Sequence, residues 1–206
     1  MPDHALKVLV VEARPERAQT LAQLLTELGM GLAGVAADGL QACLMCVRQA
    51  PDLALVASDL PGGDGIDSAR AIMRCKPLPV VLLAEREDRV MLERAQRAGV
   101  RSCLVAPVAA AVLGPALEMA HRNFGRESRL AEEVAQLREG LRQRKLLERA
   151  KGLLMARFQV DEAGALARLE DTARTLGSCL HQAAEAVVES ERMLAGPQRR
   201  RRSRAG

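Results

Sequence analysis

Aromatic side chains are nearly absent from this 206-residue sequence, which has no tryptophan, no tyrosine and two phenylalanines, Phe124 and Phe158. Stacking of bases on aromatic rings is therefore an unfavourable way for the protein to hold nucleic acid. No run of about twenty apolar residues occurs, so we expect no membrane-spanning helix. The first residues lack a basic start, an apolar stretch and a small-residue cleavage site. We predict no secretory signal and a cytoplasmic protein.

Metal-ligating and redox-active residues are few and scattered. Cys43 and Cys46 are spaced as a C-x-x-C pair, but no second pair follows at zinc-ligand spacing. Because both fall inside an apolar helical pattern, we interpret them as reduced, core-filling thiols. We assign no role to His4, His121 or His181 and predict no metal and no cofactor. No nucleophile–base pair or glycine-rich phosphate loop is visible, so we predict no enzyme.

Charge is distributed unevenly along the chain. The net charge is +4, but basic residues become frequent along a late helical stretch and end in Arg199 to Arg202 plus Arg204. This asymmetry favours a polyanionic partner. Hydrophobic residues make up 49% of the chain, enough for a substantial core and against disorder throughout.

The first half alternates short apolar runs with amphipathic stretches, and the turn at 61–65 is rich in glycine. This alternation predicts an α/β, doubly wound, five-stranded parallel sheet covered by helices on both faces. The expected strands are 6–11, 31–36, 52–57, 79–84 and 101–105, and the expected helices are 17–28, 39–49, 67–74, 88–98 and 109–122.

The second half is helical throughout. Leu130, Val134, Leu137 and Leu141 follow the seam spacing of a coiled coil and indicate a homodimer, although a helix packed on its own domain remains an alternative. Further helices are expected from Asp161 to Leu176 and from Ser178 to Leu194, with a disordered tail after them. We thus predict an α/β domain over 1–122, a coiled-coil helix over 123–143, an all-α three-helix domain over 137–195 whose first helix continues the coiled coil, and a basic tail over 196–206.

The order of strands and turns resembles response-regulator receiver domains, most closely from Pro51 through Gly65. The resemblance implies paired acids after the first strand, a phosphoacceptor aspartate ending the third, a hydroxyl after the fourth and a lysine after the fifth. The residues at these positions are Glu12 with Ala13, then Ala57, Ala84 and Ala106.

Alanine neither accepts a phosphoryl group nor neutralises its charge. The resemblance therefore implies a degenerate phosphorylation site and a pseudo-receiver that takes its input from a protein, which we expect to be an inhibitory sensor. Asp59 is the nearest other acceptor, but it lacks supporting groups and is interpreted as a solvated loop carboxylate.

The segment from Arg144 to Met155 reads RKLLERAKGLLM. It resembles the first helix of the ANTAR domain of amide- and nitrate-responsive antiterminators, with Leu147 in place of an isoleucine. This resemblance implies binding of RNA hairpins. Leu166, Glu170 and Arg174 depart from the pattern of the second ANTAR helix, which leaves the RNA contacts of that helix open.

Cations within and around this segment are the candidate RNA-binding residues. Those at 138, 142, 145 and 149 recur on one helical face, as suits contacts with phosphates. The full set is Arg138, Arg142, Arg144, Lys145, Arg149, Lys151 and Arg157.

Together these features predict a phosphorylation-independent transcription antiterminator that binds leader-mRNA hairpins of a nutrient operon, for nitrate/nitrite or amide utilisation, and acts on RNA polymerase only indirectly. Two alternatives stay open. A DNA-binding transcription factor would place the basic helix in a major groove, and a protein-interaction adaptor would leave it solvated.

Overall fold

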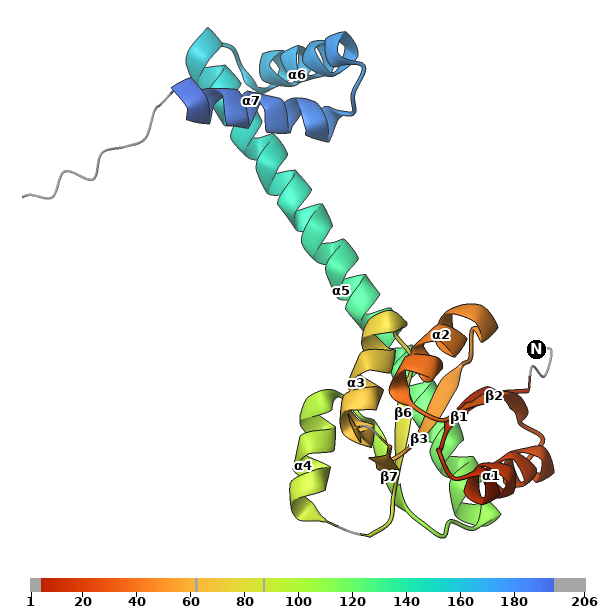
Figure 1. Cartoon of the computed structure of the whole chain (residues 1–206). Coiled ribbons are helices and arrows are strands. Elements are labelled where there is room, and N and C mark those ends of the chain that lie inside the picture. Colours follow the sequence, from red (N-terminus) through yellow and green to blue (C-terminus); the bar gives the residue numbers. More distant parts are fainter. Residues whose placement is uncertain (1–4, 62, 87, 195–206) are drawn as a thin grey trace, which may run out of the picture. The chain divides into compact units, whose positions relative to one another are not determined.

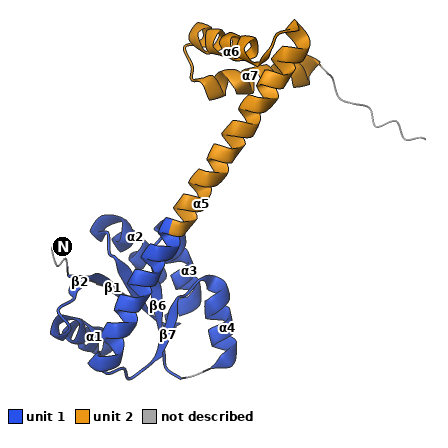
Figure 2. Cartoon of the chain, turned by 180° about the vertical axis from the view of Figure 1, so that it is seen from behind, with its two compact units in different colours: residues 1–129 blue, residues 130–206 orange. Residues whose placement is uncertain are grey.

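A computed structural model describes residues 5–61, 63–86 and 88–194 (Figure 1). His4 and the arginine run from Arg199 to Arg204 lie outside the described residues. The chain forms two compact units, residues 1–129 and residues 130–206 (Figure 2). No helix within the described ranges is long and apolar enough to cross a membrane.

The first unit contains the predicted five-stranded parallel sheet, and the predicted fold class is confirmed. The strand order is β2-β1-β3-β6-β7, so the chain reverses direction across the sheet after β2. The strands are β1 (Lys7–Val11), β2 (Gly31–Ala36), β3 (Leu53–Ala57), β6 (Val80–Ala84) and β7 (Ser102–Val105).

Helices cover both faces of this sheet because its central strands are apolar on both sides. Alternate residues of β1 enter different cores: Leu9 and Val11 pack with α2, α3 and α4, whereas Val8 and Val10 pack with α1 and α5. The helices are α1 (Pro15–Glu27), α2 (Gly39–Gln49), α3 (Gly65–Cys75), α4 (Arg89–Ala98) and α5 (Ala110–Phe158).

The predicted turn between β3 and α3 contains more structure than expected. The short strands β4 (Asp59–Leu60) and β5 (Gly63–Asp64) pair there in antiparallel fashion. Gly65 follows directly, and a Cβ atom at this position would collide with the Ala57 carbonyl oxygen. The glycine thus lets α3 begin against the end of β3.

Helix α5 is continuous from Ala110 to Phe158. The change of sequence pattern near residue 125 had predicted two separate helices there. Gly125 weakens helix propensity but does not end the helix. A Cβ atom at this position would meet nothing within 4 Å, so packing does not require the glycine.

The second unit contains the later part of α5 with α6 (Glu162–Leu176) and α7 (Leu180–Leu194). Its core joins Ala150 and Leu154 of α5 to Leu169 of α6 and Ala184 of α7. Asp161 caps α6 by accepting a hydrogen bond from the Gly164 N–H at 2.8 Å, as the sequence predicted. The three helices therefore share one small apolar core.

All five cysteines lie within the described residues and are free thiols. Cys46 is buried and Cys43 half-buried in the core under α2, as expected for core-filling thiols. Burial, and then a hydrogen bond with Cys75, raise the pKa of Cys43 to about 12. Such a thiol stays protonated near neutral pH and is a poor nucleophile.

Candidate functional site

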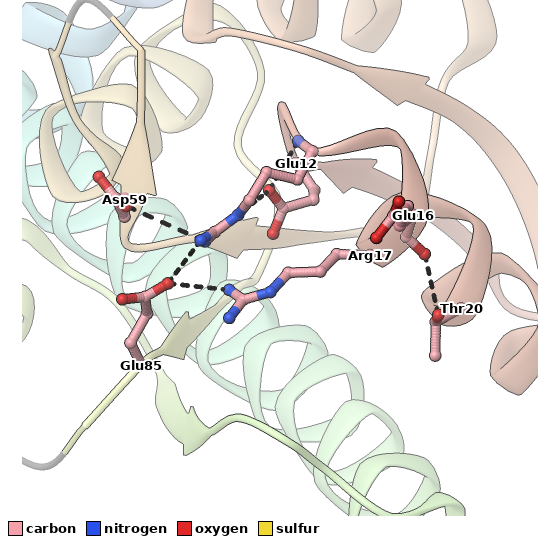
Figure 3. Close-up of polar contacts among 7 residues, drawn as sticks. Glu12, Glu16, Arg17, Thr20, Asp59 and Glu85 are labelled. Carbon is pink, nitrogen blue, oxygen red and sulfur yellow. Dashed lines mark hydrogen bonds and ion pairs between the residues drawn. The ribbon is translucent and has the colours of Figure 1, made fainter.

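Three carboxylates gather at the carboxyl edge of the sheet. Glu12 directly follows β1, Asp59 comes two residues after β3, and Glu85 directly follows β6. Since β1, β3 and β6 are adjacent parallel strands, their ends place these side chains at one edge (Figure 3). The side chain of Glu12 is completely buried, whereas those of Asp59 and Glu85 are 70% and 44% exposed.

Arg14 lies among these carboxylates. Its Nε is 3.3 Å from Oε1 of Glu12, its Nη1 is 2.7 Å from Oε1 of Glu85, and its Nη2 is 4.0 Å from Oδ2 of Asp59. Arg17 adds a second guanidinium at 3.1 Å from the same Glu85 oxygen. The acidic edge is thus bridged by two cations from the start of α1.

The backbone around Arg14 holds this arrangement in place. Pro15 opens α1 and restricts the residue before it to extended conformations, which Arg14 adopts with φ −83° and ψ 113°. The Arg14 N–H then donates to Oε1 of Glu12 at 2.9 Å. Glu12 therefore accepts hydrogen bonds from both the backbone and the side chain of Arg14.

These contacts shift the pKa values of both Glu85 and Arg14. The hydrogen bond to Arg14, and then the charges of Arg14 and Arg17, lower the pKa of Glu85. The Glu85 hydrogen bond, followed by Glu12, raises the pKa of Arg14. Glu85 and Arg14 therefore hold each other in their charged forms.

The structure places the residues predicted for the phosphorylation site at or directly after the ends of strands. Ala57 ends β3, Ala84 ends β6, Ala13 follows Glu12, and Ala106 follows β7. None of the four side chains offers an oxygen or a charge. Sequence reasoning missed Arg14 and Glu85, although the position of Glu85 directly after a buried strand was a usable signal.

The Mg²⁺ ion that receiver domains imply does not fit these residues. Oε2 of Glu12 is buried without a hydrogen bond among the described residues, which offers one acceptor to a cation. However, alanines at 13 and 57 remove two expected oxygen ligands, and Arg14 already contacts the remaining carboxylates. Within the described ranges, no group of three or more histidine, cysteine or acidic residues is arranged to hold a metal ion.

Six of the seven predicted RNA-binding cations are exposed on α5. Arg142 pairs with Glu139 at 3.0 Å, and Arg157 pairs with Glu191 of α7 at 3.2 Å. The other four make no ion pair with the residues that the structure describes. They are Arg138, Arg144, Lys145 and Arg149.

Lys151 differs from the other cations. Its side chain is 11% exposed, and its Nζ lies 2.8 Å from Glu148 and 2.6 Å from Glu162. Hydrogen bonds to these two carboxylates raise its pKa and lower that of Glu162. Lys151 therefore links α5 to the first turn of α6, and its charge is already satisfied within the fold.

Four of the exposed cations form what we call the basic stripe: Arg138, Arg142, Lys145 and Arg149. At about 100° per residue they cover a sector roughly 60° wide. The core-facing residues of α5, such as Ala150 and Leu154, point to a different side of the helix. The stripe is therefore left free by α6 and α7.

The second unit also exposes one aromatic ring. Phe158 is 44% exposed, and the guanidinium of Arg168 on α6 lies 4.2 Å from the centre of its ring. This contact joins the end of α5 to α6.

Comparisons with known proteins agree with this division. Residues 8–118 match the response regulator receiver domain, and residues 135–188 match the ANTAR domain. The transcriptional regulatory protein PdtaR of Mycobacterium tuberculosis is 35% identical over 184 residues, which cover 89% of this chain and 90% of that protein. The chain belongs to the response regulators with a receiver domain and an ANTAR domain.

Further matches concern the receiver alone. The chemotaxis protein CheY-3 of Vibrio cholerae is 31% identical over 116 residues, covering 55% of this chain and 89% of that protein. The crystal structure of a signal receiver domain of a diguanylate cyclase from Desulfovibrio desulfuricans has a TM-score of 0.56 and 32% identity. It covers 60% of this chain and 99% of that one. As a receiver–ANTAR protein, the chain is a regulator of the RNA-binding antiterminator type.

Proposed function

We propose that this receiver–ANTAR protein binds hairpins of a nascent leader transcript through the basic stripe and thereby prevents a terminator from forming. The observation that carries the proposal is the set of exposed cations on one face of α5 that form few or no pairs within the fold. Uncompensated cations on a helix face gain free energy from RNA phosphates, because counterions are released on contact.

The stripe has a length suited to several phosphates. Residues 138 to 149 span about 17 Å along the helix axis. The proposal leaves Lys151 out of the interface, since two carboxylates already neutralise it. It retains Arg144 and Arg157 as further exposed contacts, which at about 100° per residue lie outside the sector of the stripe.

A competition assay tests the proposal. The full-length protein is titrated against a two-hairpin RNA and a duplex DNA of equal length and charge, at low and moderate salt. We expect preference for the RNA, and at least about tenfold weaker binding for the double variant Arg144→Ala with Lys145→Ala, which loses two phosphate contacts.

A matched control is available on the same helix. Arg126 and Arg129 are exposed and make no ion pair within the described ranges, so their double alanine variant removes the same charge outside the second unit. RNA affinity should change by no more than about twofold in this control. Equal binding to duplex DNA would favour a DNA-binding factor, and no binding to either would favour a protein adaptor.

Dimerisation through α5 is part of the proposal. Leu130, Val134, Leu137 and Leu141 are 44–63% exposed, so this apolar seam is not covered within its own unit. Two chains pairing along the seam would present two stripes to paired hairpins and raise the effective concentration. Leu137→Asp should reduce the apparent mass from dimer to monomer in light scattering and weaken binding to two-hairpin RNA more than to a single hairpin.

The input to the receiver unit is proposed to be a protein rather than a phosphoryl group. Ala57, Ala84 and Ala106 support this, because none of them can accept, bind or neutralise phosphate. We expect an inhibitory sensor that releases the regulator when a nutrient signal arrives. The similarity of residues 144–155 to amide- and nitrate-responsive antiterminators supports a nitrate/nitrite or amide operon as the target.

A further inference from the structure

The guanidinium of Arg14 stands among carboxylates at the sheet edge where a receiver keeps its divalent cation. Its Nε and Nη1 contact Glu12 and Glu85 at 3.3 and 2.7 Å, whereas its Nη2 lies 4.0 Å from Asp59 and makes no hydrogen bond among the described residues. These carboxylates follow three adjacent strands, so a single planar cation lies between three separate segments of the chain.

We propose that Arg14 is a built-in counter-cation that replaces the divalent metal of this receiver unit and holds its strand-end loops together without Mg²⁺. The proposal concerns only the input half of the protein and does not depend on RNA binding. It rests on the proposed absence of phosphorylation, and it identifies the side chain that takes the place of the metal ion.

Burial explains why a cation is required there at all. The side chain of Glu12 has no exposure to solvent, and an ionised carboxylate without a positive partner is costly in such a place. Arg14 supplies two hydrogen bonds to one oxygen of Glu12, from its backbone and its Nε. It then continues to Glu85 through Nη1.

Arginine suits this position better than a bound ion would. Its planar guanidinium presents several donors in fixed directions, whereas Mg²⁺ requires near-octahedral oxygen ligands. Alanine at 13 and 57 removes two oxygen ligands for a metal ion. The carboxylates that remain are arranged around the planar guanidinium of Arg14. The residues present therefore match a guanidinium and not a metal.

Two neighbouring features keep Arg14 in position. Pro15 holds Arg14 in the extended conformation that brings its N–H to Glu12. Arg17 shares the Glu85 oxygen with Arg14 but does not contact Glu12, so it supports the outer part of the network only. Arg17 is therefore a natural control for charge at the same edge.

The test is a titration of the full-length protein with Mn²⁺, followed by electron paramagnetic resonance of the free ion. The wild type and Arg17→Ala should bind no Mn²⁺ at this edge. Arg14→Ala should bind Mn²⁺ at concentrations at least about tenfold below the highest one at which the wild type still binds none, because a positive charge leaves the neighbourhood of three carboxylates. Arg14→Lys, which keeps the charge, should behave as wild type.

Each alternative result has a definite meaning. Mn²⁺ binding by the wild type that disappears in Glu12→Gln would overturn the proposal, as would no gain of binding in a folded Arg14→Ala. Either result would leave the proposed RNA binding untouched, so the two proposals fail separately.

A second variant covers the case in which Arg14→Ala does not fold. The double variant Arg14→Ala with Glu12→Gln removes the buried charge together with its partner, and we expect it to fold. If the double variant also failed to fold, Arg14 would be needed for its packing rather than its charge, and the proposal would be wrong.

Discussion

The two units of this protein use their arginines and lysines in opposite ways. In the receiver unit, Arg14 and Arg17 point into a group of carboxylates and are neutralised there. In the ANTAR unit, Lys145 and Arg149 stand on an open helix face without partners among the described residues.

A basic residue that is paired within the fold differs from an unpaired one in the free energy that it gains on binding RNA. A cation that already contacts carboxylates has little free energy left to gain from a polyanion, since binding would first require breaking the internal pair. An exposed cation without a partner gains the full effect of counterion release. Net charge alone therefore does not locate a nucleic-acid interface, whereas the pairing of each cation does.

The largest expected effect comes from the core that supports the basic stripe. Leu169→Ala should destabilise the ANTAR unit by about 3 kcal/mol, because Leu169 is fully buried between the three helices. RNA binding should be lost with the fold of this unit, while calorimetry should show the receiver transition unchanged.

The control for this change lies on the same helix. Leu166 is 36% exposed, so Leu166→Ala should cost less than about 1 kcal/mol and leave RNA binding intact. A large loss of stability in both variants would show that the core shared by α5, α6 and α7 extends to Leu166.

A smaller effect is expected from Glu85 in acid. Arg14 and Arg17 lower the pKa of Glu85 in the folded protein, so its stabilising contribution is present above its unfolded pKa and is lost as pH falls through the folded value. Urea midpoints between about pH 7 and about pH 3 should therefore fall less steeply for Glu85→Gln than for wild type. Parallel curves would show that Glu85 is not held by these arginines.

The smallest effect is expected for RNA binding by Lys151→Met. Because Glu148 and Glu162 already neutralise Lys151, RNA affinity should change by no more than about twofold while the unfolding temperature decreases. Lys145→Met, an exposed change on the same helix, should weaken RNA binding and leave the unfolding temperature unchanged. If Lys151→Met weakened RNA binding more than Lys145→Met, Lys151 would belong in the interface after all.

The fold was largely predictable because its signals are local. Apolar runs such as the one ending at Val11, separated by amphipathic helices, leave few arrangements other than a covered parallel sheet. Asp161 was recognisable as a helix cap from its position before the α6 residues. The continuity of α5 through Gly125 was not predictable, because helix propensity is a weak signal beside tertiary context.

The sites were less predictable because they depend on contacts between distant residues. The sequence shows alanine at 57 and 84, but it does not show that Arg14 turns toward residues 59 and 85. Likewise, Lys151 shares the charge and segment of its neighbours, and only packing against α6 distinguishes it. The spacing of charged residues predicts which helix face they share. Three-dimensional packing decides which of these side chains remain unpaired.

The most direct test of whether unpaired cations form the RNA interface compares two variants that each remove two positive charges. Binding to two-hairpin RNA is measured against salt concentration for Lys145→Ala with Arg149→Ala and for Arg14→Ala with Arg17→Ala. The first pair should reduce the slope of log affinity against log salt by about 1 to 2, because two phosphate contacts are lost. The second pair should leave the slope unchanged, since those arginines are occupied by carboxylates. Equal reductions in both variants would show that the protein holds RNA by its overall charge and not by its unpaired cations.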